Sequence, residues 1–334
     1  MSQDIRIIFM GTPEFAVPSL NMLLDNGYNV VGVITQPDKP QGRKKILMPT
    51  PVKEAAEKRG LPVLQPTRLR QPEAVAQVAE LRPDLIVTAA YGQILPKSVL
   101  DLPRYGCLNV HGSLLPRYRG GAPIQRAIIN GETITGVTLM YMAEGLDTGD
   151  MISRVEVAIE PEDTSGTIFE KLSVAGAKLL HDELPKLLAG QSARTPQNEE
   201  EATYAPNLSR DDERIPWNDS AQQIYNRIRG LVPFSGAFTL WEENVFKVWA
   251  AEQPSVEGAS TKGASTKEAS ISNEANGSNT QAPGTVLQLN ARGIEVQTGS
   301  GTIWLTQVQP AGKKVMEAGN FARGGQMKPG MVLG

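Results

Sequence analysis

Short apolar runs alternate with amphipathic segments along the first two thirds of the chain. Strand-like runs of mainly aliphatic residues occur at Ile5–Met10, Val30–Thr35, Leu85–Ala90 and Cys107–His111. Between them, apolar residues recur with helical spacing in a segment that ends near Asn26, over Val52–Arg59 and over Pro72–Leu81. This alternation of strand and helix predicts a mainly parallel, Rossmann-like α/β sheet covered by helices.

The same region continues with two further strand-like runs and one long helix. The runs lie at Thr135–Tyr141 and Met151–Val157, and the helix is predicted over Ser165–Leu188. We therefore expect one α/β domain over residues 1–196. The polar stretch that follows, Gln197–Arg210, predicts a linker.

The last third of the chain has a different pattern, with short strand-like runs separated by turns. After a predicted helix at Ser220–Leu231, these runs are Ala237–Trp241, Phe246–Ala250, Thr285–Leu289, Ile294–Thr298 and Thr302–Val308. Many short strands with Gly-containing turns favour a small β-barrel, which we place at residues 211–334.

A low-complexity segment interrupts the predicted barrel at residues 255–282. It contains an imperfect repeat of Gly-Ala-Ser-Thr-Lys and almost no large apolar residues. Without apolar side chains to bury, such a segment does not offset the entropy that ordering would cost. We expect a loosely held insertion between two barrel strands and assign it no function.

The composition is that of a soluble globular protein, with 334 residues, 40% hydrophobic and 21% charged. No apolar run approaches the ~20 residues of a membrane span. The N-terminal MSQDIRIIFMG lacks the basic start and long apolar core of a signal peptide. The single cysteine, Cys107, cannot form an intramolecular disulfide and is expected to be a small buried hydrophobe. We expect a cytoplasmic monomer with no stable protein partner.

The net charge of −3 argues against a general polyanion-binding protein. From Arg210 onward, twelve basic side chains balance twelve acidic ones, so any contact with phosphates needs a local cluster. One such cluster, in PDKPQGRKK, contains Lys39, Arg43, Lys44 and Lys45. A charge cluster is usually a solvated face, but this one follows the second strand at a sheet edge that commonly binds ligands.

The segment NVHGSLLPRYRGGAPI, which starts at Asn109, combines polar groups with a loop rich in Gly and Pro. Asn109 and His111 are two residues apart on a predicted strand, so their side chains point to the same face. The carboxamide can donate to a developing oxyanion, and the imidazole can move a proton near neutral pH. Asp147, in LDTGD, adds a carboxylate that can orient and stabilise the charged imidazole. These groups suit acyl-type transfer to an amine without a metal or a covalent intermediate.

Less specific explanations of the same residues remain open at this point. A single histidine on a strand is more often a satisfied polar residue than a catalytic one. His111 and His181 are the only histidines, and with Cys107 they do not complete a zinc ligand set. The turn Gly11-Thr12-Pro13 after the first strand lacks the G-x-G-x-x-G pattern of dinucleotide-binding proteins.

These motifs resemble the signature of the formyltransferases that use 10-formyltetrahydrofolate. The resemblance rests on HGSLLPRYRGGAPIQ, with NV before it and LDTGD after it, and extends to FMGTPEFAVPSL, PDKPQGRKK, AAYGQILP and AGKKVM. It covers nearly the whole chain apart from the insertion, and it is strongest with the members that act on methionyl-tRNA. It implies formyl transfer from 10-formyltetrahydrofolate, as cosubstrate, to methionyl-initiator tRNA for translation initiation. It also implies a C-terminal barrel similar to an oligonucleotide-binding fold.

The resemblance implies a role for individual residues, with Asn109, His111 and Asp147 as the catalytic three. For folate, it implies Ala89, Tyr91, Gly92, Ile94, Leu95, Ser113, Leu114, Leu115, Pro116, Met142 and Gly145. For Ile94, Leu95 and Leu115 the alternative is core packing, but the resemblance favours a role in the pocket. For tRNA, it implies the basic loop with Lys39, Arg43, Lys44 and Lys45, in which Arg43 is the matching position. Independently of the resemblance, we expect Lys313 and Lys314 as a second phosphate contact, with Arg227, Arg229 and Arg323 as further candidates. No metal ligand is implied.

Two alternatives to this function stay open. The first is a related enzyme that formylates a purine precursor or a nucleotide sugar, or that releases formate to water. The second is a nucleic-acid-binding protein without activity. The basic loop and the barrel favour tRNA as substrate, and the presence of Asn109, His111 and Asp147 favours an active enzyme. Asp147 could orient His111 or accept the amine proton through water.

Overall fold

The computed structural model describes residues 4–41, 46–254 and 281–334. The chain folds into two compact units, one of Met1–Ile128 and Glu132–Leu208 and the other of Ile129–Gly131 and Ser209–Gly334. Three of the candidate tRNA residues, Arg43, Lys44 and Lys45, and almost all of the predicted insertion lie outside the described residues.

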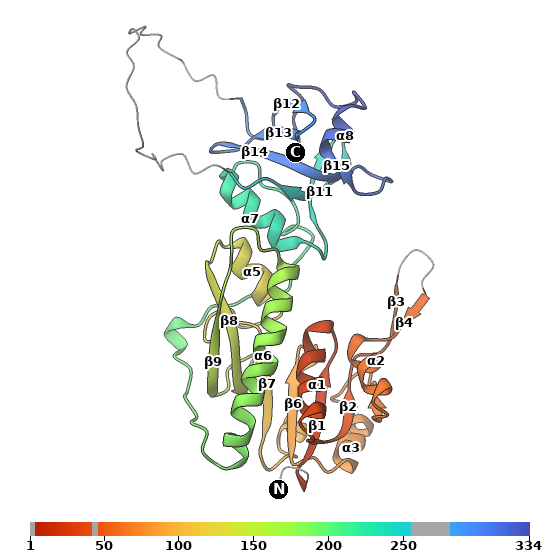
Figure 1. Cartoon of the computed structure of the whole chain (residues 1–334), viewed down its shortest axis with the longest axis vertical. Coiled ribbons are helices and arrows are strands. Elements are labelled where there is room, and N and C mark those ends of the chain that lie inside the picture. Colours follow the sequence, from red (N-terminus) through yellow and green to blue (C-terminus); the bar gives the residue numbers. More distant parts are fainter. Residues whose placement is uncertain (1–3, 42–45, 255–280) are drawn as a thin grey trace. The chain divides into compact units, whose positions relative to one another are not determined.

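The first unit is built on a seven-stranded sheet with the strand order β5-β2-β1-β6-β7-β8-β9 (Figure 1). The strands are β1 (Arg6–Gly11), β2 (Asn29–Ile34), β5 (Val63–Leu64), β6 (Leu85–Ala89), β7 (Cys107–His111), β8 (Ile134–Tyr141) and β9 (Met151–Ala158). All pairs from β5 to β7 are parallel, whereas β8 runs antiparallel to both β7 and β9. The predicted mainly parallel sheet is therefore confirmed.

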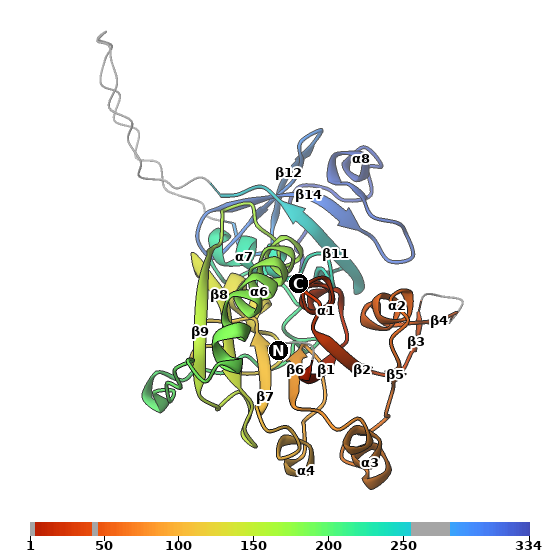
Figure 2. The same cartoon turned by 60° about the horizontal axis from the view of Figure 1, so that its bottom comes forward.

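Helices cover both faces of this sheet (Figure 2). The helices of one face are α1 (Val17–Asp25), α2 (Pro51–Lys58) and α6 (Ser165–Leu188), and those of the other are α3 (Pro72–Glu80) and α4 (Lys97–Leu100). Successive side chains of β1 point to opposite faces of the sheet. Phe9 packs in the core beneath α1, α2 and α6, and Met10 packs in the core beneath α3 and α4. Burial on both sides explains why this strand is apolar throughout.

Side-chain caps fix the start of the principal helices. Thr50 accepts a hydrogen bond from the backbone of Lys53 at α2, and Thr164 forms a capping box with Thr167 at α6. Because a cap satisfies backbone N–H groups that no helical carbonyl reaches, it sets the residue at which the helix begins.

Several short elements of the first unit have no clear periodic signal in the sequence. They are η2 (Glu14–Ala16), α5 (Pro123–Ile129), η3 (Glu199–Glu201) and the antiparallel pair β3 (Lys39–Gln41) and β4 (Ile46–Met48). The basic segment predicted as a loop is thus flanked by two short paired strands.

The larger part of the predicted linker packs on the first unit. The backbone of Arg119 donates to Thr203 and accepts from Ala205, over 2.8 and 2.7 Å. Thr195, just before the segment, exchanges backbone hydrogen bonds with Met151 of β9. This segment is held to the first unit by backbone hydrogen bonds as far as Ala205, and the boundary between the two units follows Leu208. Whether the two units fold independently stays a prediction.

The second unit contains α7 (Ala221–Leu231) and an antiparallel sheet with the order β10-β11-β14-β13-β12. Its other elements are β10 (Ala237–Trp241), β11 (Asn244–Ala251), β12 (Val286–Asn290), β13 (Gly293–Gln297), β14 (Thr302–Gln309), β15 (Met316–Glu317), which pairs with β14, and α8 (Ala318–Ala322).

The C-terminal segment joins the two edge strands of this sheet. Gly334 exchanges two backbone hydrogen bonds with Leu240 of β10, and Met331 accepts one from Val286 of β12. The unpaired edges that an open sheet would expose are therefore linked, which gives the closed barrel expected from the short strands.

Candidate active site

The three candidate catalytic residues come from β7 and from the turn after β8, both in the first unit. Asn109 and His111 alternate with Val110 along β7, so they share one face of the sheet. Cys107, on the same face, packs with Val99 of α4. The side chain of His111 is 7% exposed and that of Asp147 is 14% exposed.

Thr88 of β6 orients the carboxamide of Asn109. The Thr88 hydroxyl lies 2.9 Å from Oδ1 of Asn109, 2.9 Å from the carbonyl oxygen of Leu108 and 3.3 Å from Sδ of Met142, so Asn109 and Leu108 share its one proton. The carbonyl side of the amide is thereby occupied, and within the described residues its nitrogen makes no hydrogen bond. Asn109 can therefore donate that N–H to a substrate oxygen, which is the function of an oxyanion donor.

The backbone carbonyl of Tyr118 selects the tautomer of His111. Nε2 of His111 lies 3.2 Å from this carbonyl oxygen, which can only accept, so Nε2 carries the proton in the neutral ring. The lone pair is then on Nδ1, which lies 3.7 Å from Oδ2 of Asp147. Nδ1 is the ring atom that can take up and release a proton on the side of the carboxylate.

Asp147 lies in a tight turn and has a backbone conformation that is energetically unfavourable for a residue with a side chain. Its φ of 51° is left-handed, which is uncommon for a residue other than glycine. A β-carbon on Gly149 would lie 1.9 Å from the carbonyl oxygen of Tyr141, so only glycine fits there. The backbone N–H of Gly120 donates to Oδ2 of Asp147 over 2.8 Å and fixes the carboxylate. The turn therefore presents Asp147 toward His111.

The candidate folate residues fall into two groups. Several are buried and belong to the packed interior, namely Ala89, Tyr91, Leu95, Ser113, Leu115 and Pro116. Others are open to a ligand, since Ile94 is 80% exposed and Gly92 and Gly145 are also exposed. Leu114 is half-buried against Gly136.

Thr138 of β8 holds the turn that contains Ser113. Its hydroxyl donates to the Ser113 carbonyl over 2.7 Å and accepts from the Leu115 N–H over 3.1 Å. On the other side of the site, Met142 contacts Thr88, which also contacts Asn109. The candidate folate segments 113–116 and 142–147 therefore both adjoin the candidate catalytic residues.

Among the candidate tRNA residues that the structure describes, the lysines are exposed and one arginine is not. Lys39 lies on β3, and Lys313 and Lys314 lie in the loop between β14 and β15. Arg229 is only 9% exposed, and its guanidinium lies 5.7 Å from the ring centroid of Tyr225. Little of the Arg229 surface is therefore accessible to a phosphate, and this contact stays a prediction, since the helical pattern alone did not show which face of α7 is buried.

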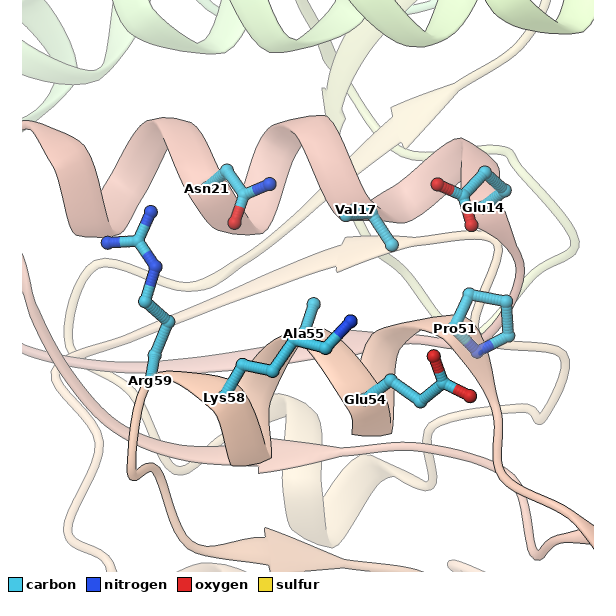
Figure 3. Close-up of a pocket in the computed structure, with 8 residues that line it drawn as sticks. All are labelled: Glu14, Val17, Asn21, Pro51, Glu54, Ala55, Lys58 and Arg59. Atoms are coloured by element: carbon cyan, nitrogen blue, oxygen red, sulfur yellow. The ribbon is translucent and has the colours of Figure 1, made fainter.

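A separate pocket of about 330 Å³ lies between α1 and α2 (Figure 3). Figure 3 shows charged side chains of both signs at its rim, including Glu14, Glu54 and Arg59. None of the candidate catalytic residues lines it. In the described residues, no set of three or more His, Cys, Asp or Glu side chains could hold a metal ion, and no helix is long and apolar enough to cross a membrane.

Sequence patterns did not identify the residues that orient the catalytic side chains. Thr88, Tyr118, Gly120 and Gln197 act through a backbone group or through a partner distant in the chain. A signal was present for Tyr118 and Gly120, which lie in the Gly- and Pro-rich loop after β7.

Comparison with known proteins adds the family. The description "Formyl transferase" matches residues 5–184, and "Formyl transferase, C-terminal domain" matches residues 207–326. A methionyl-tRNA formyltransferase of Geobacillus thermodenitrificans is 55% identical over 96% of this chain and 94% of its own length. The enzyme of the same name from Bacillus subtilis is 50% identical over 98% of both chains.

Solved structures with lower identity share the fold. An N-formyltransferase from Helicobacter canadensis, in complex with folinic acid and dTDP-3-aminofucose, superposes with a TM-score of 0.64 at 18% identity, over 92% of this chain and 99% of its own. HypX from Aquifex aeolicus, in complex with tetrahydrofolic acid, gives a TM-score of 0.61 at 18% identity, over 95% of this chain and 46% of its own.

Proposed function

The chain belongs to the formyl transferase family, among the methionyl-tRNA formyltransferases, and from this membership we propose its reaction and its catalytic residues. The protein transfers the formyl group of 10-formyltetrahydrofolate to the amino group of methionyl-initiator tRNA, which prepares that tRNA for translation initiation. Asn109, His111 and Asp147 carry the chemical step. The cytoplasm, where aminoacylated initiator tRNA is used, is the proposed location.

One observation supports this assignment most strongly. An amide N–H without a partner in the described residues, an imidazole with its lone pair on Nδ1 and a carboxylate 3.7 Å from that nitrogen belong to the same site. An amide donor, a proton carrier and a charge that stabilises the carrier are what formyl transfer to an amine requires.

The reaction forms a bond between the amine nitrogen and the formyl carbon and breaks the bond between that carbon and the folate nitrogen. The amine loses a proton, and the departing nitrogen gains one. Asn109 donates its Nδ2–H to the formyl oxygen as negative charge develops there, a contribution of about 3 kcal/mol in comparable sites. His111 carries the proton on Nδ1, and Asp147 stabilises the ring while it is charged.

The residues around the site fit the cosubstrate. The exposed Ile94 and Leu146, each more than half exposed, offer apolar surface for a flat ring. The turn at Ser113–Pro116, which Thr138 fixes, offers backbone groups to a polar ring edge. We assign the folate to the surface formed by Ile94 and Leu146 and to the turn at Ser113–Pro116, with its formyl group toward Asn109.

The basic residues are the proposed binding site for tRNA. Lys39, Arg43, Lys44 and Lys45 in the first unit, and Lys313 and Lys314 in the second, are the proposed phosphate contacts. Such contacts position a nucleic acid without reading its bases.

The direct test is the identity of the product. The purified protein would be incubated with 10-formyltetrahydrofolate and, in separate reactions, methionyl-initiator tRNA, an amino sugar nucleotide or no acceptor. Formylated methionyl-tRNA as the dominant product is the expected result. Formyl-sugar, or free formate formed at the same rate without acceptor, would overturn the proposed function.

A further inference from the structure

One three-residue stretch holds both members of the proposed acid–base pair. The carbonyl of Tyr118 contacts Nε2 of His111 at 3.2 Å, and the N–H of Gly120 donates to Oδ2 of Asp147 over 2.8 Å. We call Tyr118–Gly120 the strap. Because the two contacts are only two residues apart, any shift of the strap changes the position of His111 relative to Asp147.

The side chain in the middle of the strap, Arg119, is completely buried. Its Nε and Nη2 donate to Oε1 of Gln197 over 3.0 and 2.9 Å. Its Nη1 and Nη2 donate to the two carboxylate oxygens of Glu199 over 2.8 and 2.7 Å. This bidentate pairing fixes the guanidinium in one orientation, and a lysine could not reproduce it.

Gln197 connects this arginine to the turn that carries Asp147. While its Oε1 accepts from Arg119, its Nε2 donates to the carbonyls of Asp147 and Gly149 over 2.7 and 2.8 Å. One side-chain amide therefore links the strap to two carbonyls of the turn that carries Asp147. Its oxygen and its nitrogen are both hydrogen-bonded, so its orientation is fixed.

The backbone at these positions needs such support. Tyr118 and Asp147 have φ values of 61° and 51°, and side chains other than glycine adopt this left-handed region only at a cost. Conformations of this kind persist where the surroundings fix them. Gln197 and Glu199, in the segment after α6, supply that fixation by binding the Arg119 guanidinium, and Gln197 also binds the turn that carries Asp147.

Stability alone does not explain a buried arginine at this position. Burying a guanidinium removes it from water, and the gain from pairing with a carboxylate often only balances that cost. Glu199, its partner, is 69% exposed, so the pair is open to solvent on one side. The hydrogen bond from Arg119 keeps the pKa of the Glu199 carboxyl below its usual value, and the pair is charged at neutral pH.

From these contacts we infer that Arg119 and Gln197 are positioning residues for the formyl transfer, acting through Asp147 and His111. This inference rests on the proposed function, because it assigns to the two residues the alignment of its catalytic pair. Neither residue touches the reacting atoms. Both set the distance and direction between Nδ1 of His111 and Oδ2 of Asp147.

The test uses isosteric substitutions with matched controls in the full-length protein. Gln197→Met and Arg119→Met remove the polar contacts and keep most of the volume. Gln191→Met and Arg59→Met make the same chemical changes at exposed positions, and Arg59 pairs with Asp25 on the surface of the first unit, away from the strap. For each variant, kcat, the KM of both substrates and the melting temperature would be measured.

We expect Gln197→Met to lower kcat by about 10- to 100-fold, since a misplacement of about 1 Å at a catalytic group has effects of this size. The KM values should change by only a few-fold, because neither substrate contacts the residue. The two control variants should keep kcat within about two-fold. A folded Gln197→Met variant with unchanged kcat would overturn the inference, even if Arg119→Met failed to fold.

A second measurement separates positioning from a general structural role. When Asp147 is already replaced by Asn, adding Gln197→Met should lower kcat further by less than about three-fold. The reason is that the effects of substitutions in residues that act as one unit are not additive. A full additional loss would mean that Gln197 acts elsewhere, which contradicts the inference. If Asp147→Asn alone left the rate of formyl transfer unchanged, the catalytic role of Asp147 would be disproved, and so would the inference that depends on it. The product test above would still decide the proposed reaction separately.

Discussion

The Thr88 hydroxyl lies 2.9 Å from Oδ1 of Asn109, and this contact leaves the amide nitrogen of Asn109 available to the substrate. Thr88 belongs to β6 and Asn109 to the adjacent strand β7, where the two residues are direct register partners. The parallel pairing of these two strands therefore places the Thr88 hydroxyl at the oxygen end of the Asn109 amide and leaves its nitrogen end without a hydrogen bond in the described residues.

Replacing Thr88 by valine should slow the chemical step. The substitution keeps the shape and removes the hydroxyl, so the amide of Asn109 loses the contact that fixes its direction. We expect kcat to fall about ten-fold, with the KM of both substrates nearly unchanged and a stability loss of about 1–2 kcal/mol. Steady-state kinetics of the purified variant would measure this.

Thr138→Val is the matched comparison for that variant. Thr138 is also a buried strand threonine, but its hydroxyl holds the Ser113–Leu115 backbone instead of Asn109. The same chemical change there should raise the KM for folate more than it lowers kcat. If the two valine variants had the same kinetic defect, the separate roles of these hydroxyls would be disproved.

Six of the seven strands of the central sheet lie within one residue of their predicted bounds, whereas β5, with only two residues, was not predicted. β1 and β7 lie between two layers of helices, and such strands are nearly all apolar. The strands β3 and β4 were not predicted, because Pro40 and the charged residues between the two strands interrupt any alternation of apolar and polar residues. The contacts of the segment after Gln197 were hidden for a related reason: backbone hydrogen bonds leave no trace in side-chain patterns.

For the site, the motif identifies the groups proposed to do the chemistry but not those proposed to align them. Asn109 and His111 stand out because their polar chemistry interrupts an apolar strand. Arg119 and Gln197 meet across 78 positions of the chain, and Gln197 lies 50 positions from Asp147. No local pattern connects residues at such separations, so only the folded chain reveals the link.

Substitutions in the basic loop should weaken use of the tRNA without affecting the folate. Arg43→Ala and the double change Lys44→Ala/Lys45→Ala remove positive charges that we propose to contact phosphates. We expect the KM for tRNA to rise several-fold, and its dependence on salt to become less steep by about one unit of slope for each lost contact. Titrations at several salt concentrations would measure both.

Lys58→Ala, at an exposed position of α2, provides the control for charge alone. It should leave the KM for tRNA within experimental error. If the loop variants had a raised KM for folate and used tRNA normally, the proposed role of the loop in binding tRNA would be wrong.

Shortening the low-complexity segment should leave the barrel intact. β11 and β12 are separated in the sheet by β14 and β13, and at about 4.8 Å per strand the gap is about 14 Å. Six Gly/Ser residues in place of residues 255–280 reach about 20 Å, enough to cross that gap. We expect a stability change of only about 1 kcal/mol and unchanged turnover, measured by thermal melting and formyl transfer. A folded variant that had lost activity only with tRNA would show that the segment takes part in recognition.

Cys107 should be unreactive in the folded protein. Its side chain is buried near the carbonyls of Val99 and Leu100, and burial raises the pKa of the thiol to about 12. A thiol reagent at pH 8 should therefore label the native chain slowly and the urea-unfolded chain fully at one site. Rapid labelling of the native protein would contradict this burial.

The same shift gives a direction for the pH dependence of stability. In the unfolded chain the thiol ionises near pH ~8.5, whereas in the folded chain it stays protonated until about pH 12. The contribution of Cys107 is thus complete below pH ~8.5 and is lost as the pH rises toward 12. Cys107→Ala should flatten the alkaline fall in stability measured by urea unfolding between these values.

The role of His111 in formyl transfer is tested most directly by the single-turnover rate. With saturating 10-formyltetrahydrofolate and the enzyme in excess over methionyl-initiator tRNA, His111→Ala should transfer the formyl group at least about 100-fold more slowly than the unaltered protein. Its affinity for tRNA should stay within a few-fold. His181→Ala, which changes the other histidine at an exposed position of α6, should react at the normal rate. A His111→Ala protein that transfers formyl at nearly the rate of the unaltered protein would contradict the proposed mechanism.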